Sequence, residues 1–315
     1  MTVAVLGEAL IDLIMGDDGA YRPHLGGSPF NVAIGLARQG IDVSYLAPLS
    51  DDTFGDRLHQ ALIAAGVTVP VKRRSKWPTS LALVAVDANG KPAYRLYREG
   101  IADKDTSVEE IVANLPDGLQ ALHTGSLAIT PSQLPKIREL FELMRERGIT
   151  ISMDINIRLR ASIDTGAYLS GVRSLLPLAD IVKASDEDLE PFEFAADTHG
   201  AARAAYEEMG NGMLVLTEGR GGALLHTTRG IVEASAYPIA NVVDTVGAGD
   251  TFHAAFLASL IRSNVDSRSI GDADRETLRT TIDFACAAAA INVSRDGCNP
   301  PTYSEVENFV LAAKR

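Results

Sequence analysis

The alternation of apolar runs with amphipathic segments predicts strands and helices that follow one another along most of the chain. Short apolar runs typical of buried strands occur at residues 3–6, 43–49, 121–125, 150–154, 180–184 and 213–217. Segments with the apolar spacing of helices lie at residues 29–39, 54–65, 132–147, 166–176, 186–194 and 201–209. This alternation indicates βαβ units, and therefore an α/β fold with a mostly parallel sheet covered by helices on both faces.

Residues 67–103 break the alternation. Two strand-like runs, 80–87 and 92–99, are joined by Ala88-Asn89-Gly90, and Asn-Gly between such runs is a strong hairpin signal. No helix separates them, so we expect a small antiparallel flap beside the main body, with residues 13–25 adding strands. Later segments predict an antiparallel addition to the main sheet and a helical end, at residues 223–226, 231–236, 250–262, 275–293 and 303–313.

Composition limits the class of protein. The 315 residues are 46% hydrophobic, enough for one large domain over residues 1–315 with a sizeable core. The formal charge of −12 argues against broad nucleic-acid binding. Cys286 and Cys298 match no metal-binding spacing and suggest a reducing compartment. Residues 1–7 lack the basic flank of a signal peptide, and no run is long enough to span a membrane, so we expect a cytoplasmic protein.

The stretch at residues 244–252, DTVGAGDTF, is predicted to carry the chemistry. Gly247, Ala248 and Gly249 leave little side chain over the backbone, so an anion can approach the amides. The helix that follows presents free N–H groups and the positive end of its dipole, which together favour phosphate. Asp250 lies in the first helical turn, where a carboxylate could accept a proton from an alcohol. Taken alone, the stretch could also be only a tight turn and a helix cap.

A second glycine-containing helix start occurs at residues 26–31, GGSPFN, where Ser28 can cap the helix and Pro29 suits its first position. In this order, the two stretches resemble the two signatures of the ribokinase-like (PfkB) carbohydrate kinases, and the resemblance covers nearly the whole chain. It implies a ribokinase-like three-layer αβα sandwich. It also implies that the flap, formed by about residues 13–25 and 67–103, is a β-lid.

The resemblance implies ATP-dependent phosphorylation of a sugar hydroxyl. Asp250 matches the catalytic base of the family, and the glycine-rich turn matches its anion hole. The sequence contains no Gly-x-x-x-x-Gly-Lys-Ser/Thr, so it is not that of a P-loop enzyme. Mg²⁺ is expected to bridge the nucleotide phosphates, held largely through water and substrate oxygens. Asp244 and Thr245, with the loop at 294–297, are candidates for holding a monovalent cation such as K⁺, as in several relatives.

The residues that the resemblance assigns to the sugar are Asp12, Gly26, Gly27, Asn31, Arg98 and Arg158. Asp12 would accept hydrogen bonds from two hydroxyls, and the two glycines would let the sugar lie against the backbone. Arg98 lies in a lid segment, residues 94–103, that is similar to that of fructokinases. Arg158 ends an Asp-x-Asn-x-Arg stretch shared by fructokinases and 2-keto-3-deoxygluconate kinases. The lid segment favours D-fructose as substrate and fructose 6-phosphate as product.

Two alternatives stay open at this point. The sugar could be 2-keto-3-deoxygluconate or the substrate of another PfkB kinase, because both ketose-like ends would suit the same residues. The chain could also be a non-catalytic sugar- or nucleotide-sensing module on the same fold, although the intact Asp250 and Gly-Ala-Gly turn count against that.

The residues assigned to the nucleotide are Lys183, Ser185, Asp188, Thr217, Gly219, Gly222 and Asn292. Ser185 and Asp188 stand where the family has Asn and Glu. Because Asp is one methylene shorter than Glu, a water bridge to the metal is expected in place of direct contact. The expected partners are a free sugar and ATP, and a homodimer formed through the exposed lids is a candidate assembly.

Overall fold

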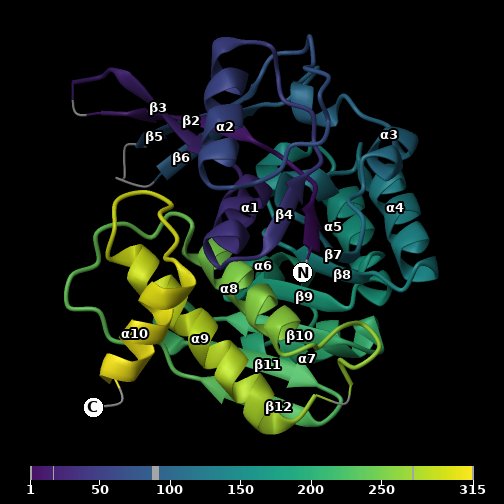
Figure 1. Cartoon of the computed structure of the whole chain (residues 1–315), viewed down its shortest axis with the longest axis vertical. Helices are drawn as coiled ribbons and strands as arrows, with labels where there is room; N and C mark the ends of the chain where they lie inside the picture. The colour runs from purple at the N-terminus through teal and green to yellow at the C-terminus, as the bar shows by residue number, and fades with distance from the viewer. Residues whose placement is uncertain (1, 17, 87–91, 272, 314–315) are drawn as a thin grey trace.

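The computed structural model describes residues 2–16, 18–86, 92–271 and 273–313, which form two sheets with helices packed around the larger one (Figure 1). The strands are β1 (Thr2–Val5), β2 (Leu10–Met15), β3 (Tyr21–Gly26), β4 (Asp42–Tyr45), β5 (Ser80–Val86), β6 (Pro92–Tyr97), β7 (Leu119–Gly125), β8 (Thr150–Asp154), β9 (Ile181–Ser185), β10 (Met213–Thr217), β11 (Ala223–Thr227) and β12 (Gly230–Ala234). The helices are α1 (Ser28–Arg38), α2 (Thr53–Ala64), α3 (Val108–Ala113), α4 (Leu134–Glu146), α5 (Thr165–Arg173), α6 (Asp186–Leu189), α7 (Thr198–Met209), α8 (Ala248–Arg262), α9 (Arg275–Val293) and α10 (Tyr303–Ala313). Among the helices of these ranges, none combines the length and apolar character needed to cross a membrane.

The larger sheet confirms the predicted parallel arrangement. Its strand order is β12-β11-β10-β9-β8-β7-β1-β4, and every neighbouring pair from β10 to β4 is parallel. The pairs β10–β11 and β11–β12 are antiparallel, as the late strand pattern predicts. Since the carboxyl ends of parallel strands share one edge, the loops that follow β8, β9 and β10 come together there.

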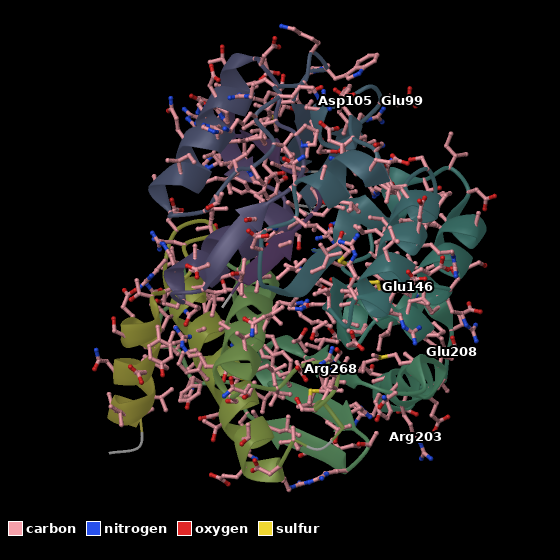
Figure 2. All side chains as sticks on the ribbon, turned by 45° about the vertical axis from the view of Figure 1, so that its right-hand side comes forward. Glu99, Asp105, Glu146, Arg203, Glu208 and Arg268 are labelled. Atoms are coloured by element: carbon pink, nitrogen blue, oxygen red, sulfur yellow. The ribbon has the colours of Figure 1, made fainter. Side chains whose placement is uncertain are left out.

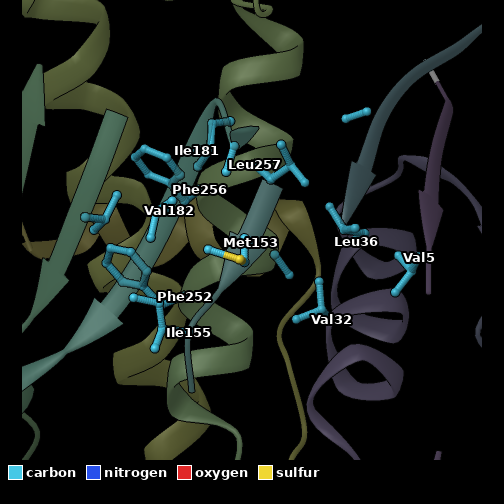
Figure 3. Close-up of a cluster of buried hydrophobic side chains, with 14 of the residues drawn as sticks. Val5, Val32, Leu36, Met153, Ile155, Ile181, Val182, Phe252, Phe256 and Leu257 are labelled. Carbon is cyan, nitrogen blue, oxygen red and sulfur yellow. The ribbon is translucent and has the colours of Figure 1, made fainter. Parts of the chain in front are cut away.

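Helices cover the larger sheet, and the hydrophobic core lies between the layers. Helix α8 packs against both α1 and α9, while α4 packs against β8 and α7 against β10 (Figure 1). The buried side chains of Phe252, Phe256 and Leu257 on α8 lie in one cluster with Ile181 and Val182 of β9 (Figure 3). Helix α8 is buried along most of its length because it has packing partners on several sides.

The charged residues of the chain mostly lie on its outside. Glu99, Glu146, Arg203 and Arg268, which Figure 2 labels, are examples of charged residues with exposed side chains. Most of the excess negative charge is therefore in contact with solvent. The few charged side chains that are buried are the ones whose position needs a structural or functional explanation.

The smaller sheet is the predicted lid, with the order β3-β2-β5-β6. The pairs β2–β3 and β5–β6 are antiparallel, as expected for two hairpins, but the central pair β2–β5 is parallel. The flap is therefore not antiparallel throughout. Each hairpin leaves the main body separately, β2 directly after β1 and β5 after α2, so the two leading strands run in the same direction. The predicted Asn-Gly turn at residues 88–90 lies outside the described residues.

One predicted helix differs from the structure, and one short helix was not predicted. The helix expected over residues 186–194 ends at Leu189 and continues as a 3₁₀ turn over Glu190–Phe192, because Pro191 has no N–H and cannot continue the α-helical ladder. The short helix α3 was not predicted. Its start is marked by Ser107, whose side chain accepts a hydrogen bond from the Glu110 N–H.

Buried charges lie at the junction between the two sheets. Arg98 follows β6 and pairs with Asp103 at 2.9 Å, and both side chains are less than a tenth exposed. Its guanidinium also donates to Ser80 Oγ of β5. Glu8, between β1 and β2, is buried beside this pair, and burial raises the pKa of its carboxyl to about 7, although the Arg98 charge opposes the shift.

We expect Glu8 to make the protein less stable as the pH rises. Its pKa is raised in the folded state, so its contribution is fully present below about pH 4.5 and is lost as the pH passes about 7. The loss corresponds to roughly 3 kcal/mol. Glu8→Gln should therefore flatten the decline of the melting temperature between pH 5 and pH 7.5.

The matched control is Glu146→Gln, which changes an exposed carboxylate on α4 (Figure 2). It should leave the wild-type pH profile unchanged. Parallel melting profiles for Glu8→Gln and the wild type would show that the buried carboxyl does not titrate as inferred.

Candidate active site

The N-termini of α1 and α8 lie against each other at the centre of the site. Four residues after Asn31 and Asp250, Gly35 meets Ala254 so closely that a Cβ on Gly35 would lie 2.7 Å from the Ala254 Cβ. The close approach brings the preceding turns together as well, because residues four apart share a helix face. As a result, Ser28 Oγ donates to Asp250 Oδ1 at 2.6 Å and Asn31 Nδ2 donates to Asp250 Oδ2 at 2.7 Å.

The carboxylate of Asp250 is buried and oriented by these two donors. Burial raises the pKa of Asp250, and the hydrogen bonds from Ser28 and Asn31 oppose that shift because they stabilise the ionised form. Each carboxylate oxygen keeps a lone pair beyond the one used by its donor. The group is thus a fixed carboxylate of increased basicity, which is suited to accepting a proton.

The glycine-rich turn before α8 depends on Gly247. This residue is the N-cap of the helix with φ 71°, and a Cβ there would lie 2.2 Å from Cys298 Sγ. The amides of Gly249 and Asp250 fall in the first helical turn, where no preceding helix carbonyl can accept from them. Beneath the turn, the Lys183 Nζ lies 3.4 Å from the position of a Cβ on Gly249. Free amides and an ammonium group therefore meet at one place, which suits an anion.

Asp12 lies close enough to interact with this centre. It pairs with His24 across β2 and β3, and its Oδ2 would lie 2.3 Å from a Cβ on Gly26, so the glycine leaves room for the carboxylate. Burial raises the pKa of Asp12 to about 6, the charges of His24 and Arg158 oppose the shift, and the charge of Asp250 adds to it. The structure therefore brings Asp12, Arg158 and Asp250 into one electrostatic neighbourhood.

His24 was missed at the level of sequence. The signal was present, because aligning residues 10–15 with 21–26 as a hairpin places His24 opposite Asp12.

Gly27 is needed at its position for the backbone alone, apart from any contact with a sugar. Its φ is 109°, and a Cβ there would lie 2.5 Å from the Glu8 carbonyl oxygen, so the link between β1 and β2 packs directly on it.

Arg98 is placed apart from this group. Its guanidinium is bonded to Asp103 and Ser80, and its nearest charged neighbours include Glu8. The expectation that Arg98 binds the sugar finds no support in this geometry. The buried ion pair links the end of β6 to Asp103, and the binding of the sugar by Arg98 stays a prediction.

Lys183 is held by Asp154. The two residues are cross-strand neighbours of β9 and β8, and Lys183 Nζ donates to both carboxylate oxygens of Asp154 at 2.9 Å. The side chains are 5% and 1% exposed. Burial alone would raise the pKa of Asp154, but the Lys183 charge holds it well below its usual value. The ammonium group is therefore kept charged beneath the glycine-rich turn.

A row of buried polar side chains continues from this pair, and it was not predicted. His123 of β7 is the cross-strand neighbour of Ser152 of β8, and its Nδ1 lies 3.1 Å from the Ser152 Oγ. The same hydroxyl lies 2.7 Å from the Nε2 of His253 on α8. The His253 Nδ1 is 3.8 Å from Asp154 Oδ2. Burial lowers the pKa of both histidines, so they are neutral.

Ser185 and Asp188 form the capping box at the start of α6. Asp188 Oδ2 accepts from the Ser185 N–H and hydroxyl, and Oδ1 accepts from the Ile157 N–H after β8 at 2.7 Å. The Asp188 carboxylate thus joins two strand ends at the predicted nucleotide edge. Its expected water-bridged contact with a metal stays a prediction.

Thr217, Gly219 and Gly222 lie where β10 ends. Thr217 is the cross-strand neighbour of Ser185, so the two predicted nucleotide segments share the carboxyl edge of the sheet. Gly219 and Gly222 have φ of 54° and 98°, and a Cβ on Gly222 would lie 2.1 Å from the Ala234 carbonyl oxygen. The turn therefore keeps side chains away from the space beyond β10.

Asn292 lies in the interior of the protein. It is fully buried, its Nδ2 donates to the Val246 carbonyl at 2.9 Å, and its Oδ1 accepts from the Asn299 N–H at 2.9 Å. Its side-chain amide ties α9 to the glycine-rich turn and to the loop before α10. These internal hydrogen bonds give no support to the predicted contact of Asn292 with adenine, which stays a prediction.

Oxygen ligands for a cation are concentrated at one place. Asp244 Oδ1 accepts from the Val246 N–H and Oδ2 from the Gly297 N–H, each at 3.0 Å, so this carboxylate joins the two loops expected to flank a monovalent ion. The Thr245 carbonyl accepts from the Ala248 N–H. Within the described ranges, no group of three or more His, Cys, Asp or Glu side chains could hold a metal ion. A divalent ion would therefore need phosphate and water oxygens as its main ligands.

Gly247→Ala should cost more stability than the backbone conformation alone explains. The matched control is Gly210→Ala at the end of α7, which has φ 73° and no atom within 4 Å of the place that a Cβ would take. The control should lose about 1 kcal/mol, the usual cost of a left-handed residue with a Cβ. Gly247→Ala must also displace Cys298, so urea unfolding should show a clearly larger loss. Equal losses would mean that the turn has free space there.

A family profile and curated relatives match most of the chain. The family profile "pfkB family carbohydrate kinase" matches residues 2–304. A fructokinase of Rhizobium leguminosarum bv. trifolii is 34% identical over 87% of this chain and 84% of its own length. A fructokinase of Escherichia coli is 30% identical over 97% of this chain and 98% of its own length.

Solved structures of two kinases superpose closely on this chain. The fructokinase of Xylella fastidiosa with bound ATP superposes with a TM-score of 0.89, at 28% identity over 100% of this chain and 99% of that one. The aminoimidazole riboside kinase of Salmonella enterica, complexed with aminoimidazole riboside and an ATP analogue, gives a TM-score of 0.83, at 26% identity over 98% and 100% of the two chains. The fold is thus ribokinase-like, and the relatives are sugar phosphotransferases.

Proposed function

Because this chain belongs to the pfkB family of carbohydrate kinases, we propose that it is an ATP-dependent fructokinase that converts D-fructose to fructose 6-phosphate. The observation that carries the proposal is the position of Asp250, a buried carboxylate beside free main-chain amides and within electrostatic reach of Asp12. The curated relatives named above, both fructokinases, support fructose as the sugar.

In the proposed reaction, Asp12, Gly26, Gly27 and Arg158 bind the sugar and Asp250 accepts the proton of its 6-hydroxyl. The hydroxyl oxygen forms a bond to the γ-phosphorus while the bond from that phosphorus to the bridging oxygen of ADP breaks. The amides of the glycine-rich turn donate to the equatorial oxygens, where charge must be balanced. Asn31 acts on Asp250 in this scheme, since its side-chain amide orients the base.

The nucleotide would lie along the carboxyl edge of the sheet, past Lys183 and the turn formed by Thr217, Gly219 and Gly222. Bound Mg²⁺ would neutralise phosphate charge, with its ligands drawn from the phosphates and water. Asp244, with main-chain oxygens near Thr245, has the oxygen chemistry that a monovalent cation such as K⁺ requires. Ser185 and Asp188 would support the phosphates from the start of α6.

A substrate panel tests this proposal. ADP release should be fastest with D-fructose and should be slow with 2-keto-3-deoxygluconate, ribose, adenosine and aminoimidazole riboside. The last compound is included because a kinase for it is among the structural neighbours. Turnover of the keto-acid or the riboside in the absence of fructose turnover would replace the proposed substrate. Sugar binding without ADP formation would favour a sensing module.

Asp250→Asn in the same assay tests the base. It should lower kcat by about 10²- to 10⁴-fold, the usual contribution of a general base. ATP binding and the melting temperature should stay close to wild type, because Asn keeps the shape of the side chain. Ser28→Ala is the matched control, because it removes one donor to Asp250 and leaves the carboxylate in place. A kcat for Asp250→Asn near that of Ser28→Ala would refute the assignment.

We also propose that the lids form a homodimer. Ile14, Met15, Tyr21 and Tyr97 are apolar or aromatic side chains of the lid that are 36–52% exposed. Light scattering after size exclusion should give the mass of a dimer, and Tyr21→Glu should shift it to a monomer. Leu311→Glu, at another exposed apolar site on α10, should leave the dimer intact. A monomeric wild type at micromolar concentration would rule the dimer out.

A further inference from the structure

The buried row beneath the glycine-rich turn contains an unused hydrogen-bond donor position. Four of its groups are arranged by strand pairing, since His123 lies opposite Ser152 and Asp154 lies opposite Lys183. His253 enters the row from α8, one helical turn after the base. Its Nδ1 is buried and has no hydrogen-bond partner, and at 3.8 Å from Asp154 Oδ2 it is too distant to form a bond.

The hydrogen bonds of the row determine where its protons lie. The Ser152 hydroxyl has one proton and lies between His123 Nδ1 and His253 Nε2. If His253 carries its proton on Nδ1, then His253 Nε2 accepts from Ser152, and Ser152 accepts from His123. The opposite order would leave a bare nitrogen lone pair on His253 facing the Asp154 carboxylate. The first order is favoured because it avoids that repulsion, and it leaves only an acceptor, His123 Nε2, without a partner.

Lys183 faces two competing demands during the proposed reaction. It lies beneath Gly249, where it would meet the transferred phosphoryl group, but both of its short hydrogen bonds go to Asp154. If the ammonium group moves toward the phosphoryl oxygens, Asp154 loses its main partner. A buried carboxylate without a donor is strongly unfavourable, so the movement of Lys183 would be resisted.

We propose that His253 is a reserve donor that releases Lys183. When the phosphoryl group draws Lys183 away, the His253 Nδ1–H moves onto Asp154 Oδ2 and keeps that carboxylate satisfied. No proton is transferred in this exchange, since His253 stays neutral and Asp154 stays ionised. His253 is a positioning residue, because it acts on the reaction through Asp154 and Lys183. The inference rests on the proposed kinase function, but it does not depend on which sugar is phosphorylated.

Two isosteric substitutions separate this role from simple packing. In His253→Asn, the side-chain NH₂ lies near the place of Nδ1 and keeps a donor for Asp154. In His253→Gln, the side-chain amide lies near the place of Nε2, where its oxygen accepts from Ser152, and the donor for Asp154 is lost. We expect His253→Asn to keep kcat within about threefold of wild type. We expect His253→Gln to lose about 10- to 100-fold in kcat, the effect of one hydrogen bond to a charged group, with little change in the KM for sugar.

Both variants remove an imidazole from the same buried site, so their melting temperatures should fall by similar amounts. Equal kcat values for the two variants, whether both near wild type or both low, would overturn the proposal. The comparison uses whichever sugar of the panel the wild type phosphorylates, so a failure of the fructose assignment would not be mistaken for a failure of His253.

Nitrogen-15 NMR of the histidine-labelled wild type gives a readout that does not depend on turnover. The resonances of His253 are assigned by their absence in His253→Asn. In the free protein they should report a neutral ring with its proton on Nδ1. With sugar and a non-hydrolysable ATP analogue, the Nδ1 resonance should move in the direction of a stronger hydrogen bond. A proton on Nε2, or an unchanged Nδ1 resonance in a saturated complex, would refute the reserve-donor role.

Discussion

Two hydrogen bonds from α1 to the buried carboxylate of Asp250 are the interaction on which this structure depends. They cross between segments more than two hundred residues apart in the chain and fix the proposed base relative to the first turn of α1. They exist because Gly35 lets α1 approach Ala254 of α8 without an intervening side chain. A larger residue at position 35 would separate the helices, and the base would lose its orientation before any ligand arrived.

Other carboxylates in the interior are also paired with groups that stabilise their negative charge. Asp154 is stabilised by Lys183, Asp103 by Arg98, and Asp188 by donors from the backbone and Ser185. Burial of an ionised group without such partners is prohibitive, so each buried carboxylate determines what must lie next to it. Asp154 and Lys183 come from neighbouring strands, and the register of the sheet therefore determines how this buried pair is placed.

Much of the fold could be predicted because it depends on local patterns. The alternation of apolar runs specified the parallel sheet, and the glycines and Asp250 specified a helix start with free amides. The roles of Arg98 and Asn292 could not be predicted in this way. Both belong to segments that resemble functional motifs, but their side chains turn into the protein and are bonded there. Whether a polar residue faces a ligand or a buried partner depends on tertiary contacts that no local pattern contains.

The row from His123 to Lys183 was missed for a related reason. Its members are isolated polar residues within apolar strands and one helix, and each gives no signal by itself. They become a group only when the register places His123 opposite Ser152 and Asp154 opposite Lys183.

In the lid, the parallel pairing of β2 with β5 has a mechanical consequence. Because β2 and β5 are each joined to the main body and pair with each other, a displacement of either hairpin would disturb this pairing or carry the other hairpin with it.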